Sequence, residues 1–283
     1  MNVVSLFNGM NTGRQALENV GIKVEKYYSS EIKSYAIELT QHHFPDTIQV
    51  GDVTKWKEWN IDWKSIDLIL SGSPCQDLSA AGKRAGINGS KSSLFFVFVE
   101  ILEHIKSLNS KVLFLQENVG SASKLDVGIM SRALGVYPVR INSKLVTAQL
   151  RDRYYWSNIK TKETMFDIVT DIPQPKDLGI MLNNIVTGGN VDKDKHSCLN
   201  TGSGETYKNQ ESLKHRNETT GMITLIYEEN DGLVRTVNKI EMCRLQGFPD
   251  DYCDILTTAK AGSLLGDGWT LPIIEHIFNF IER

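Results

Sequence analysis

Residues 66–79 read IDLILSGSPCQDLS, an apolar run that leads directly into a proline and a cysteine. The run 66–70 predicts a buried strand and places Pro74 and Cys75 at its carboxyl end. In an open α/β sheet this edge is where ligands and chemistry collect. Most free cysteines are small buried hydrophobes, but a cysteine in this position is also a candidate nucleophile, because its thiolate is reactive.

The segments around this strand alternate between strand-like and helix-like patterns. Helical spacing of apolar residues follows the first strand and recurs in the segments after the second and fourth. This rhythm predicts βαβ units, and hence a doubly wound, mostly parallel α/β sheet with right-handed crossovers. Strands are predicted at 3–7, 24–30, 48–50, 66–70 and 111–115, helices around 14–20 and at 31–43 and 94–105, and an antiparallel edge at 139–146 and 154–156.

The chain then becomes polar from residue 161 to 230, where it is rich in Gly, Asn, Lys and Thr. Such a stretch is too long for an ordinary loop in a compact domain. We therefore predict a small second lobe at 161–230, and one main domain made of residues 1–160 and 231–283. Helices are expected again at 239–245 and 271–281.

The bulk composition narrows the class of protein. The 283 residues are 41% hydrophobic, enough for a large core, and no apolar run long enough for a membrane span or signal peptide is visible. The four cysteines lack CxxC spacing, so we expect neither a disulfide framework nor a metal site, and we expect a reducing cytosol. A net charge of -3 argues against a uniformly basic surface but leaves room for a local nucleic-acid patch.

Three successive strand ends carry groups suited to an adenosine-containing cofactor. Gly9 and Gly13 follow the first strand, where glycine lets the backbone approach a ligand and the next helix offers its N–H groups. Glu31 ends the second strand and could accept bonds from both ribose hydroxyls. Asp52 ends the third and could accept from an adenine amino group. Alone, each acid would be a solvated loop residue; together they favour the cofactor.

Two further stretches could complete a reactive site. Glu117 and Asn118 end the fifth strand, and if that strand neighbours the fourth, Glu117 would share a pocket with Cys75 and could protonate a ring nitrogen. The segment 140–162 is basic and aromatic, which suits phosphate or base contacts. The alternative is that its arginines line one solvated strand face. A glycine-rich turn at 265–270 could close the cofactor pocket.

The order of these motifs resembles the cytosine-C5 DNA methyltransferase family over most of the chain. The resemblance rests on Phe7-x-Gly9, Pro74-Cys75-Gln76, Glu117-Asn118-Val119, Gln149-x-Arg151-x-Arg153 and the stretch Arg244-Leu245-Gln246-Gly247-Phe248-Pro249. Residues 7–13, 75–79, 94–96 and 265–269, with the short middle segment, are most similar to the Dnmt3 branch of that family.

The resemblance implies a Rossmann-like, S-adenosylmethionine-dependent fold with a small target-recognition lobe, acting on cytosine flipped out of DNA. It implies that Cys75 adds to C6, that Glu117 donates to N3, that Asn118 helps hold the ring, and that Arg151 and Arg153 anchor the base. S-adenosylhomocysteine would be the product, with no metal involved. The implied cofactor-binding residues are Phe7, Gly9, Thr12, Gly13, Glu31, Ile32, Asp52, Val53, Pro74, Leu94, Asp267 and Trp269.

Two departures and two alternatives accompany the resemblance. Many members have Asn where this chain has Asp267, near the methionine part of the cofactor, and Asn8 stands where the Dnmt3 branch has Asp. The alternatives are a tRNA cytosine-5 methyltransferase with the same fold and a catalytically inactive DNA-binding relative. The expected partner is double-stranded DNA, with no membrane, in a bacterial or phage-infected cytoplasm or in a eukaryotic nucleus. A homodimer, a restriction-modification role and the recognition sequence are left open.

Overall fold

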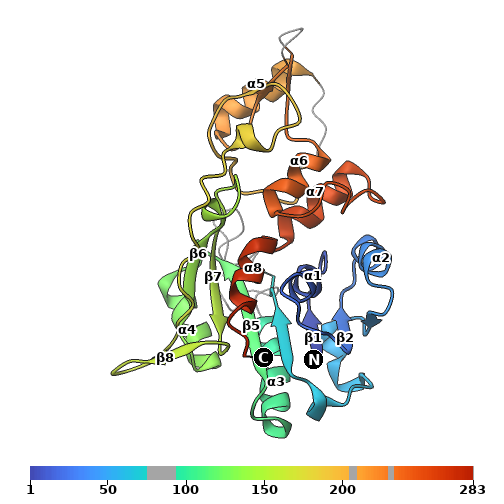
Figure 1. The fold of residues 1–283 in the computed structure, drawn as a ribbon, viewed down its shortest axis with the longest axis vertical. Helices are drawn as coiled ribbons and strands as arrows, with labels where there is room; N and C mark the ends of the chain where they lie inside the picture. The colour runs from blue at the N-terminus through green and yellow to red at the C-terminus, as the bar shows by residue number, and fades with distance from the viewer. Residues whose placement is uncertain (75–93, 204–208, 229–232, 283) are drawn as a thin grey trace. The chain divides into compact units, whose positions relative to one another are not determined.

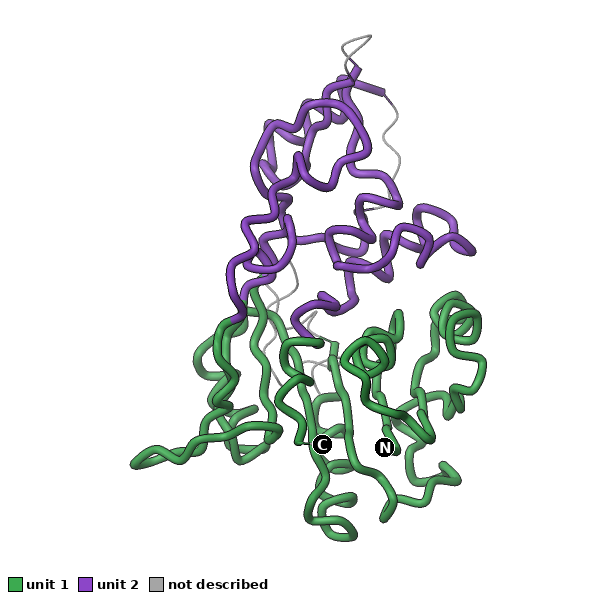
Figure 2. Tube along the Cα trace, in the orientation of Figure 1, with its two compact units in different colours: residues 1–141, 152–174, 275–283 green, residues 142–151, 175–274 purple. Residues whose placement is uncertain are grey.

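The computed structural model describes residues 1–74, 94–203, 209–228 and 233–282. The chain forms two compact units (Figure 2). Unit 1 comprises residues 1–141, 152–174 and 275–283, and unit 2 comprises residues 142–151 and 175–274. The predicted nucleophile Cys75 and the residues 76–79 that follow it lie outside the described part of the chain.

Unit 1 is built on a seven-stranded sheet in the order β3-β2-β1-β4-β5-β7-β6 (Figure 1). The pairs from β3 to β5 are parallel, whereas β7 runs antiparallel to β5. This confirms the predicted mostly parallel α/β sheet with an antiparallel edge. The strands are β1 (Asn2–Leu6), β2 (Lys26–Ser30), β3 (Ile48–Gln49), β4 (Leu68–Ser71), β5 (Leu113–Val119), β6 (Val139–Asn142) and β7 (Asp152–Ser157).

The strand order reverses between β1 and β4, and this switch point is where open α/β sheets bind ligands. The connecting helices are α1 (Thr12–Asn19), α2 (Ser34–His43), α3 (Leu94–Leu108) and α4 (Lys124–Leu134), with short 3-10 helices η1 (Val53–Glu58) and η2 (Trp63–Ser65). The terminal helix α8 runs over Leu271–Phe278.

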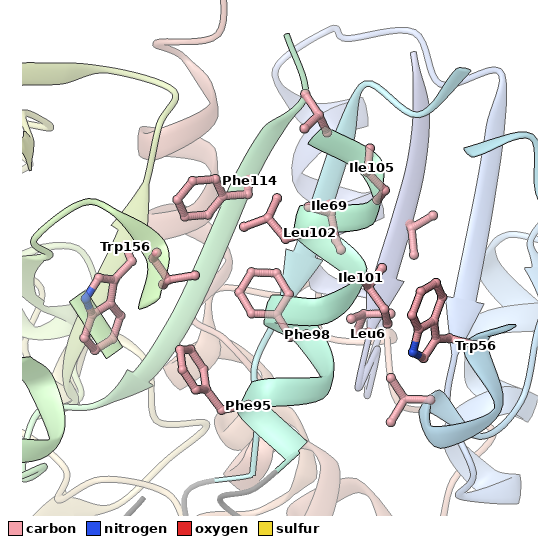
Figure 3. Close-up of a cluster of buried hydrophobic side chains, with 14 of the residues drawn as sticks. Leu6, Trp56, Ile69, Phe95, Phe98, Ile101, Leu102, Ile105, Phe114 and Trp156 are labelled. Atoms are coloured by element: carbon pink, nitrogen blue, oxygen red, sulfur yellow. The ribbon is translucent and has the colours of Figure 1, made fainter. Parts of the chain in front are cut away.

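The main core of unit 1 lies between α3 and the sheet. Phe98, Ile101 and Leu102 of α3 are fully buried, and they pack in one cluster with Ile69 and Phe114 from the strands (Figure 3). Because α3 is apolar at helical spacing, it can cover the strands along its whole length. This packing fixes β4 and β5 side by side, with Leu68 opposite Leu113 and Ser71 opposite Gln116.

Glu117 and Asn118 lie at the end of the fifth strand, as predicted, because backbone pairing of β5 with β7 continues to the Val119–Arg153 partners. Strand β5 begins at Leu113 and not at residue 111. Helix α4 was not predicted. The Ser123 side chain caps its first turn by accepting from the Asp126 N–H at 3.1 Å, and Gly135 ends it in the left-handed region at φ 71°.

Unit 2 has shorter strands and a smaller sheet than unit 1. It contains the 3-10 helices η3 (Ser143–Leu145) and η4 (Leu182–Asn184) and a three-stranded antiparallel sheet of β10 (Asn190–Val191), β11 (Ile226–Tyr227) and β12 (Val234–Arg235). Its helices are α5 (Gln210–Thr220), α6 (Lys239–Gln246) and α7 (Thr258–Asp267). The hairpin of β8 (Thr161–Glu163) and β9 (Ile168–Thr170) belongs to unit 1.

The compact units do not follow the predicted boundaries at 161 and 230, since residues 161–174 pack in unit 1 and residues 231–274 in unit 2. The predicted glycine-rich turn at 265–270 is also wrong in its first half, because α7 continues through Asp267. Gly266 permits this continuation: a Cβ there would lie 2.3 Å from the Asn200 carbonyl oxygen. Among the described helices, none is long and apolar enough to cross a membrane.

Candidate active site

The end of β4 is tied to β5 through Ser73, two residues before Cys75. The Ser73 hydroxyl accepts hydrogen bonds from Gln116 Nε2 at 3.0 Å and from Asn118 Nδ2 at 3.4 Å. Asn118 also accepts from the Val119 N–H at 2.8 Å, so its side chain is held at both ends. The sequence did not single out Ser73 or Gln116, because only the pairing of β4 with β5 reveals their contact.

Glu117 forms an ion pair with Arg153 across the β5–β7 pair. Arg153 Nε lies 2.8 Å from Glu117 Oε1, and the two side chains are only 13% and 10% exposed. Glu117 lies opposite Tyr155, so Arg153 occupies the diagonal position two residues away on the same face. An ion pair this far from water is strong enough to fix the carboxyl group. The sheet therefore brings together Glu117 and Arg153, two of the predicted site residues.

Arg151 has a different environment from Arg153. It is 2% exposed and belongs to unit 2. Its Nη1 donates to the carbonyl oxygens of Leu199 at 3.2 Å and Gly266 at 3.1 Å, and its Nη2 donates to that of Gly268 at 2.7 Å. These contacts fasten the backbone on both sides of Asp267. They favour a positioning role for Arg151, and its predicted contact with the base remains a prediction.

The interpretation of the arginines as a solvated face is wrong, because both side chains are largely buried. Other cations of the basic segment are also paired. Arg140 Nε donates to Asp152 Oδ2 at 2.8 Å, and Lys160 Nζ lies 3.8 Å from Asp171. Arg140, Arg151, Arg153 and Lys160 of this segment are therefore all engaged by carboxylates or carbonyl groups of the protein.

The loop between β1 and α1 is tightly wound at the switch point. Phe7, Gly9 and Asn11 all have positive φ, at 56°, 57° and 64°. For Phe7 this conformation is costly, and such strain collects at binding sites. Gly13 has a packing reason as well: a Cβ there would lie 2.4 Å from Leu70 Cδ1. Glycine at this position lets α1 pack against β4.

Two acidic side chains lie at the neighbouring strand ends, as predicted. Glu31 follows β2 and accepts from the backbone N–H groups of Gly9 at 2.8 Å, Ile32 at 2.7 Å and Lys33 at 2.9 Å. It therefore joins the β1–α1 loop to the end of β2. The Ile32 side chain beside it is 75% exposed, which leaves an apolar face accessible.

Asp52 begins η1 with an ordered side chain. Its Oδ1 accepts from both the backbone N–H and the hydroxyl of Thr54, each at 2.9 Å. The backbone N–H is the main cause that lowers the pKa of Asp52, so the carboxylate is ionised at neutral pH. Both of these bonds use Oδ1.

The described residues fit an adenosine-containing cofactor with a charged end. Helix α1 begins without a side-chain cap, and its N-cap Asn11 is fully buried with neither amide atom hydrogen-bonded. A buried amide without a partner is costly, so a polar ligand group there would be stabilised. Val53 is 5% exposed and Leu94 partly buried, and both pack in the core cluster.

The remaining predicted cofactor residues are placed as follows. Thr12 is 4% exposed at the start of α1, and Pro74 is half-buried after β4. Asp267 and Trp269 belong to unit 2, where Asp267 ends α7. Within the described residues, no group of three or more His, Cys, Asp or Glu side chains is arranged to hold a metal ion.

Comparisons with known proteins agree with this architecture. The model of the family "C-5 cytosine-specific DNA methylase" matches residues 1–229. The type II methyltransferase M1.ScrFI of Lactococcus lactis subsp. cremoris is 29% identical over 97% of this chain and 76% of its own length. The orphan methyltransferase M.SPRI of Bacillus phage SPR is 33% identical over 56% of this chain and 38% of its own length.

Solved structures share the fold at low identity. The Entamoeba histolytica methyltransferase EhMeth superposes with a TM-score of 0.71 at 15% identity, over 100% of this chain and 99% of that one. The S. pombe Dnmt2 methyltransferase gives 0.63 at 15% identity over 99% and 98%. These confirm the predicted fold. The finer resemblance to the Dnmt3 branch finds no support in the relatives named here.

Proposed function

The chain belongs to the C-5 cytosine-specific DNA methylase family, and we propose that it methylates C5 of cytosine in double-stranded DNA. The observation that carries the proposal is the buried Glu117–Arg153 ion pair, next to the Asn118–Ser73 contact at the end of β4. Cys75 follows Ser73 by two residues. We propose that the Cys75 thiol acts on the same base as this carboxyl group and guanidinium. The family assignment does not favour the tRNA alternative.

The cofactor of the proposed reaction is S-adenosylmethionine, which supplies an electrophilic methyl group. Glu31 would hold its ribose and Asp52 its adenine amino group, with Ile32 against the ring. Phe7, Gly9, Thr12 and Asn11 would surround its methionine end, where the uncapped start of α1 attracts a carboxylate. Pro74, Leu94, Asp267 and Trp269 are proposed to complete this site, and S-adenosylhomocysteine is the product.

The chain's own residues carry the proposed chemistry on the base. The cytosine is flipped out of the helix, because C5 and C6 are inaccessible within the stack. The Cys75 thiolate adds to C6, and the electron pair of the C5–C6 bond becomes available at C5. The Glu117 carboxylate takes up a proton from water as the base binds and donates it to N3, while Arg153 keeps Glu117 in place and Asn118 helps hold the ring. After methyl transfer, water accepts the C5 proton, the C5–C6 double bond re-forms, Cys75 leaves as a thiolate and the N3 proton returns to Glu117.

We also propose that residues 161–230 contribute target recognition and that the protein acts on DNA in a bacterial or phage-infected cytoplasm. Its relatives named above are bacterial and phage methyltransferases. The type II relative suggests that this chain acts together with a restriction enzyme. The orphan relative suggests instead that it acts without one. Mapping methylated cytosines in the DNA of cells that express the chain would give the recognition sequence.

The covalent step is tested with a duplex that carries 5-fluorocytosine at the mapped site. Fluorine cannot leave as a proton does, so wild-type protein with S-adenosylmethionine should be trapped as a covalent adduct stable to denaturing gel electrophoresis. The variant Cys75→Ser should form none. Cys198→Ser is the matched control, since its hydroxyl can still accept the Arg151 bond, and it should react like wild type.

Three results would count against the proposal. A Cys75→Ser protein that is trapped as efficiently as wild type would show that Cys75 is not the nucleophile. An adduct with 5-fluorocytosine tRNA and none with any DNA would move the substrate to RNA. An inactive relative would give no adduct with either.

A further inference from the structure

The β8–β9 hairpin of unit 1 presents two large apolar side chains to solvent. Met165 and Phe166 are each 87% exposed at its tip, and Ile168 beside them is 42% exposed. The hairpin projects from the rest of unit 1 in Figure 1. Turn centres in soluble proteins usually carry Gly, Pro, Asn, Asp or Ser, so a Met-Phe pair there calls for a reason other than folding.

The tip is held rigidly. The Thr164 N–H and hydroxyl both donate to the Asp167 carbonyl oxygen, at 2.8 and 2.7 Å, and the Asp167 N–H donates back to the Thr164 hydroxyl at 3.0 Å. The base is fastened as well, since the Tyr137 N–H donates to the Ile168 carbonyl and the Thr170 N–H to the Tyr137 carbonyl, each at 2.8 Å. A preorganised turn loses little conformational entropy when it binds a partner.

The tip borders a surface pocket of about 380 Å³ that reaches the end of α4. One wall carries the cation Arg132 and the other the carboxylates Glu163 and Asp167. All three side chains are exposed, and within the described residues they form no ion pair with one another. Protruding apolar groups, a recess and both signs of charge thus lie on one face, as a self-complementary surface requires.

We infer that this tip face, made of Arg132, Tyr137, Glu163, Met165, Phe166 and Asp167, pairs with the same face of a second copy of the chain. In a two-fold arrangement Phe166 of each copy enters the recess of the other. Arg132 of each copy then faces Glu163 and Asp167 of its partner, so every ionic contact forms twice. The two carboxylates disfavour nucleic acid as the occupant, because they would repel phosphates.

The tip face lies away from the candidate active site within unit 1. Strand β7 runs from Arg153, opposite Val119, to Ser157, opposite Leu115, so the chain leaves it at the amino-terminal edge of β5. Glu117 and Asn118 lie toward the other edge. Pairing through the hairpin therefore leaves that edge of unit 1 uncovered, and the inference does not rest on the proposed function.

Sedimentation equilibrium of the full chain over a wide concentration series tests the inference. The six residues of the tip face are few compared with the roughly 20–30 that each partner contributes to a stable interface, so wild type should show a weak, concentration-dependent dimer. Phe166→Asp should weaken the dimer at least tenfold. The control Leu125→Asp, at a side chain 70% exposed on α4, should leave it unchanged. A wild type that stays monomeric, or a dimer indifferent to Phe166→Asp, would overturn the inference.

Charge reversal distinguishes this face from any other route to a dimer. Arg132→Glu alone and the double variant Glu163→Arg, Asp167→Arg alone should each be monomeric, because each copy then repels its twin. Mixed in equal amounts they should form a heterodimer, because both ionic contacts are then attractive, one with the original sign and one with reversed sign. Failure of the mixture to associate would refute the proposed pairing of Arg132 with the two carboxylates.

Discussion

Two arginines that are two residues apart have separate tasks. Arg153 holds Glu117 through one short ion pair, whereas Arg151 donates to three backbone carbonyls that belong to distant segments of unit 2. A planar guanidinium presents five N–H donors in a fixed fork, whereas an ammonium presents three from a single nitrogen. The first contact orients a reactive carboxyl group, and the second orders the backbone around Asp267.

Lysine substitutions should separate these tasks. Arg151→Lys should lower the free energy of unfolding by roughly 2 kcal/mol, because it leaves buried carbonyl groups without donors. Arg153→Lys should leave stability nearly unchanged but slow methyl transfer about tenfold or more, because the Glu117 carboxyl is held less firmly. Urea unfolding and single-turnover methylation measure the two effects. An Arg151→Lys protein as stable as wild type but inactive would instead assign Arg151 to the reacting groups.

At the scale of elements, the start of α6 joins three segments of unit 2. The Asn238 side chain caps the helix by accepting from the Glu241 N–H at 2.9 Å, and the Glu241 carboxylate accepts from the Asn238 N–H. Glu241 is fully buried, yet it also accepts from Thr187 and pairs with Arg235 of β12 at 2.8 Å. The capping box thereby anchors both β12 and the segment at 187.

This anchor should make the stability of the protein depend on pH in acid. Burial raises the pKa of Glu241, but hydrogen bonds from Arg235, Thr187 and Asn238 outweigh it and lower the pKa below its ordinary 4.5. The ionised carboxylate thus contributes stability above that value, and the contribution is lost as pH falls through the folded pKa. Glu241→Gln should be less stable at neutral pH and lose less on acidification.

Thermal unfolding between neutral pH and pH about 3 measures this difference. The control Glu228→Gln removes another partner of Arg235, but one whose side chain is 44% exposed and screened by solvent. It should retain the acid dependence of wild type. Equal acid dependence in wild type and Glu241→Gln would contradict the prediction.

At the scale of the whole molecule, the sheet order gathers groups that are far apart in the chain. Parallel pairing of β1 with β2 and β2 with β3 brings the glycine loop, Glu31 and the end of β3 to one edge. The reversal between β1 and β4 then opens that edge toward Ser73 and β5. A ligand bound there contacts several elements at once, and its binding free energy adds to the stability of the fold.

S-adenosylhomocysteine should therefore raise the melting temperature, with a gain of about 2.7 kcal/mol at a hundredfold excess over its Kd. Asp52→Asn should reduce the affinity about tenfold. Its Oδ1 can still cap Thr54, but an NH2 group then replaces the second oxygen and cannot accept from the adenine amino group. Calorimetric titration gives the Kd. The control is Asp171→Asn, an exposed residue that directly follows β9. Unchanged affinity in Asp52→Asn would remove Asp52 from the adenine site.

The sequence by itself determined the alternating α/β class, the positions of β1, β2, β4 and α3, and the order of the motifs. These depend on local periodicity and on turn residues near each strand end, which a single segment carries. The position of Pro74 after β4 and the acids Glu31 and Asp52 could be found for the same reason. Helix α4 and the continuation of α7 were missed, because their caps and the close approach to Gly266 involve contacts that periodicity does not encode.

Only the tertiary structure decided which side chains meet. Ser73 contacts Asn118 because β4 and β5 are neighbours, and Arg153 reaches Glu117 because β7 runs antiparallel in one particular register. Arg151 and Arg153 look alike in sequence, since both are arginines on one short segment. Their different partners arise from long-range packing, where the energy of a buried charge depends on the groups around it rather than on its neighbours in the chain.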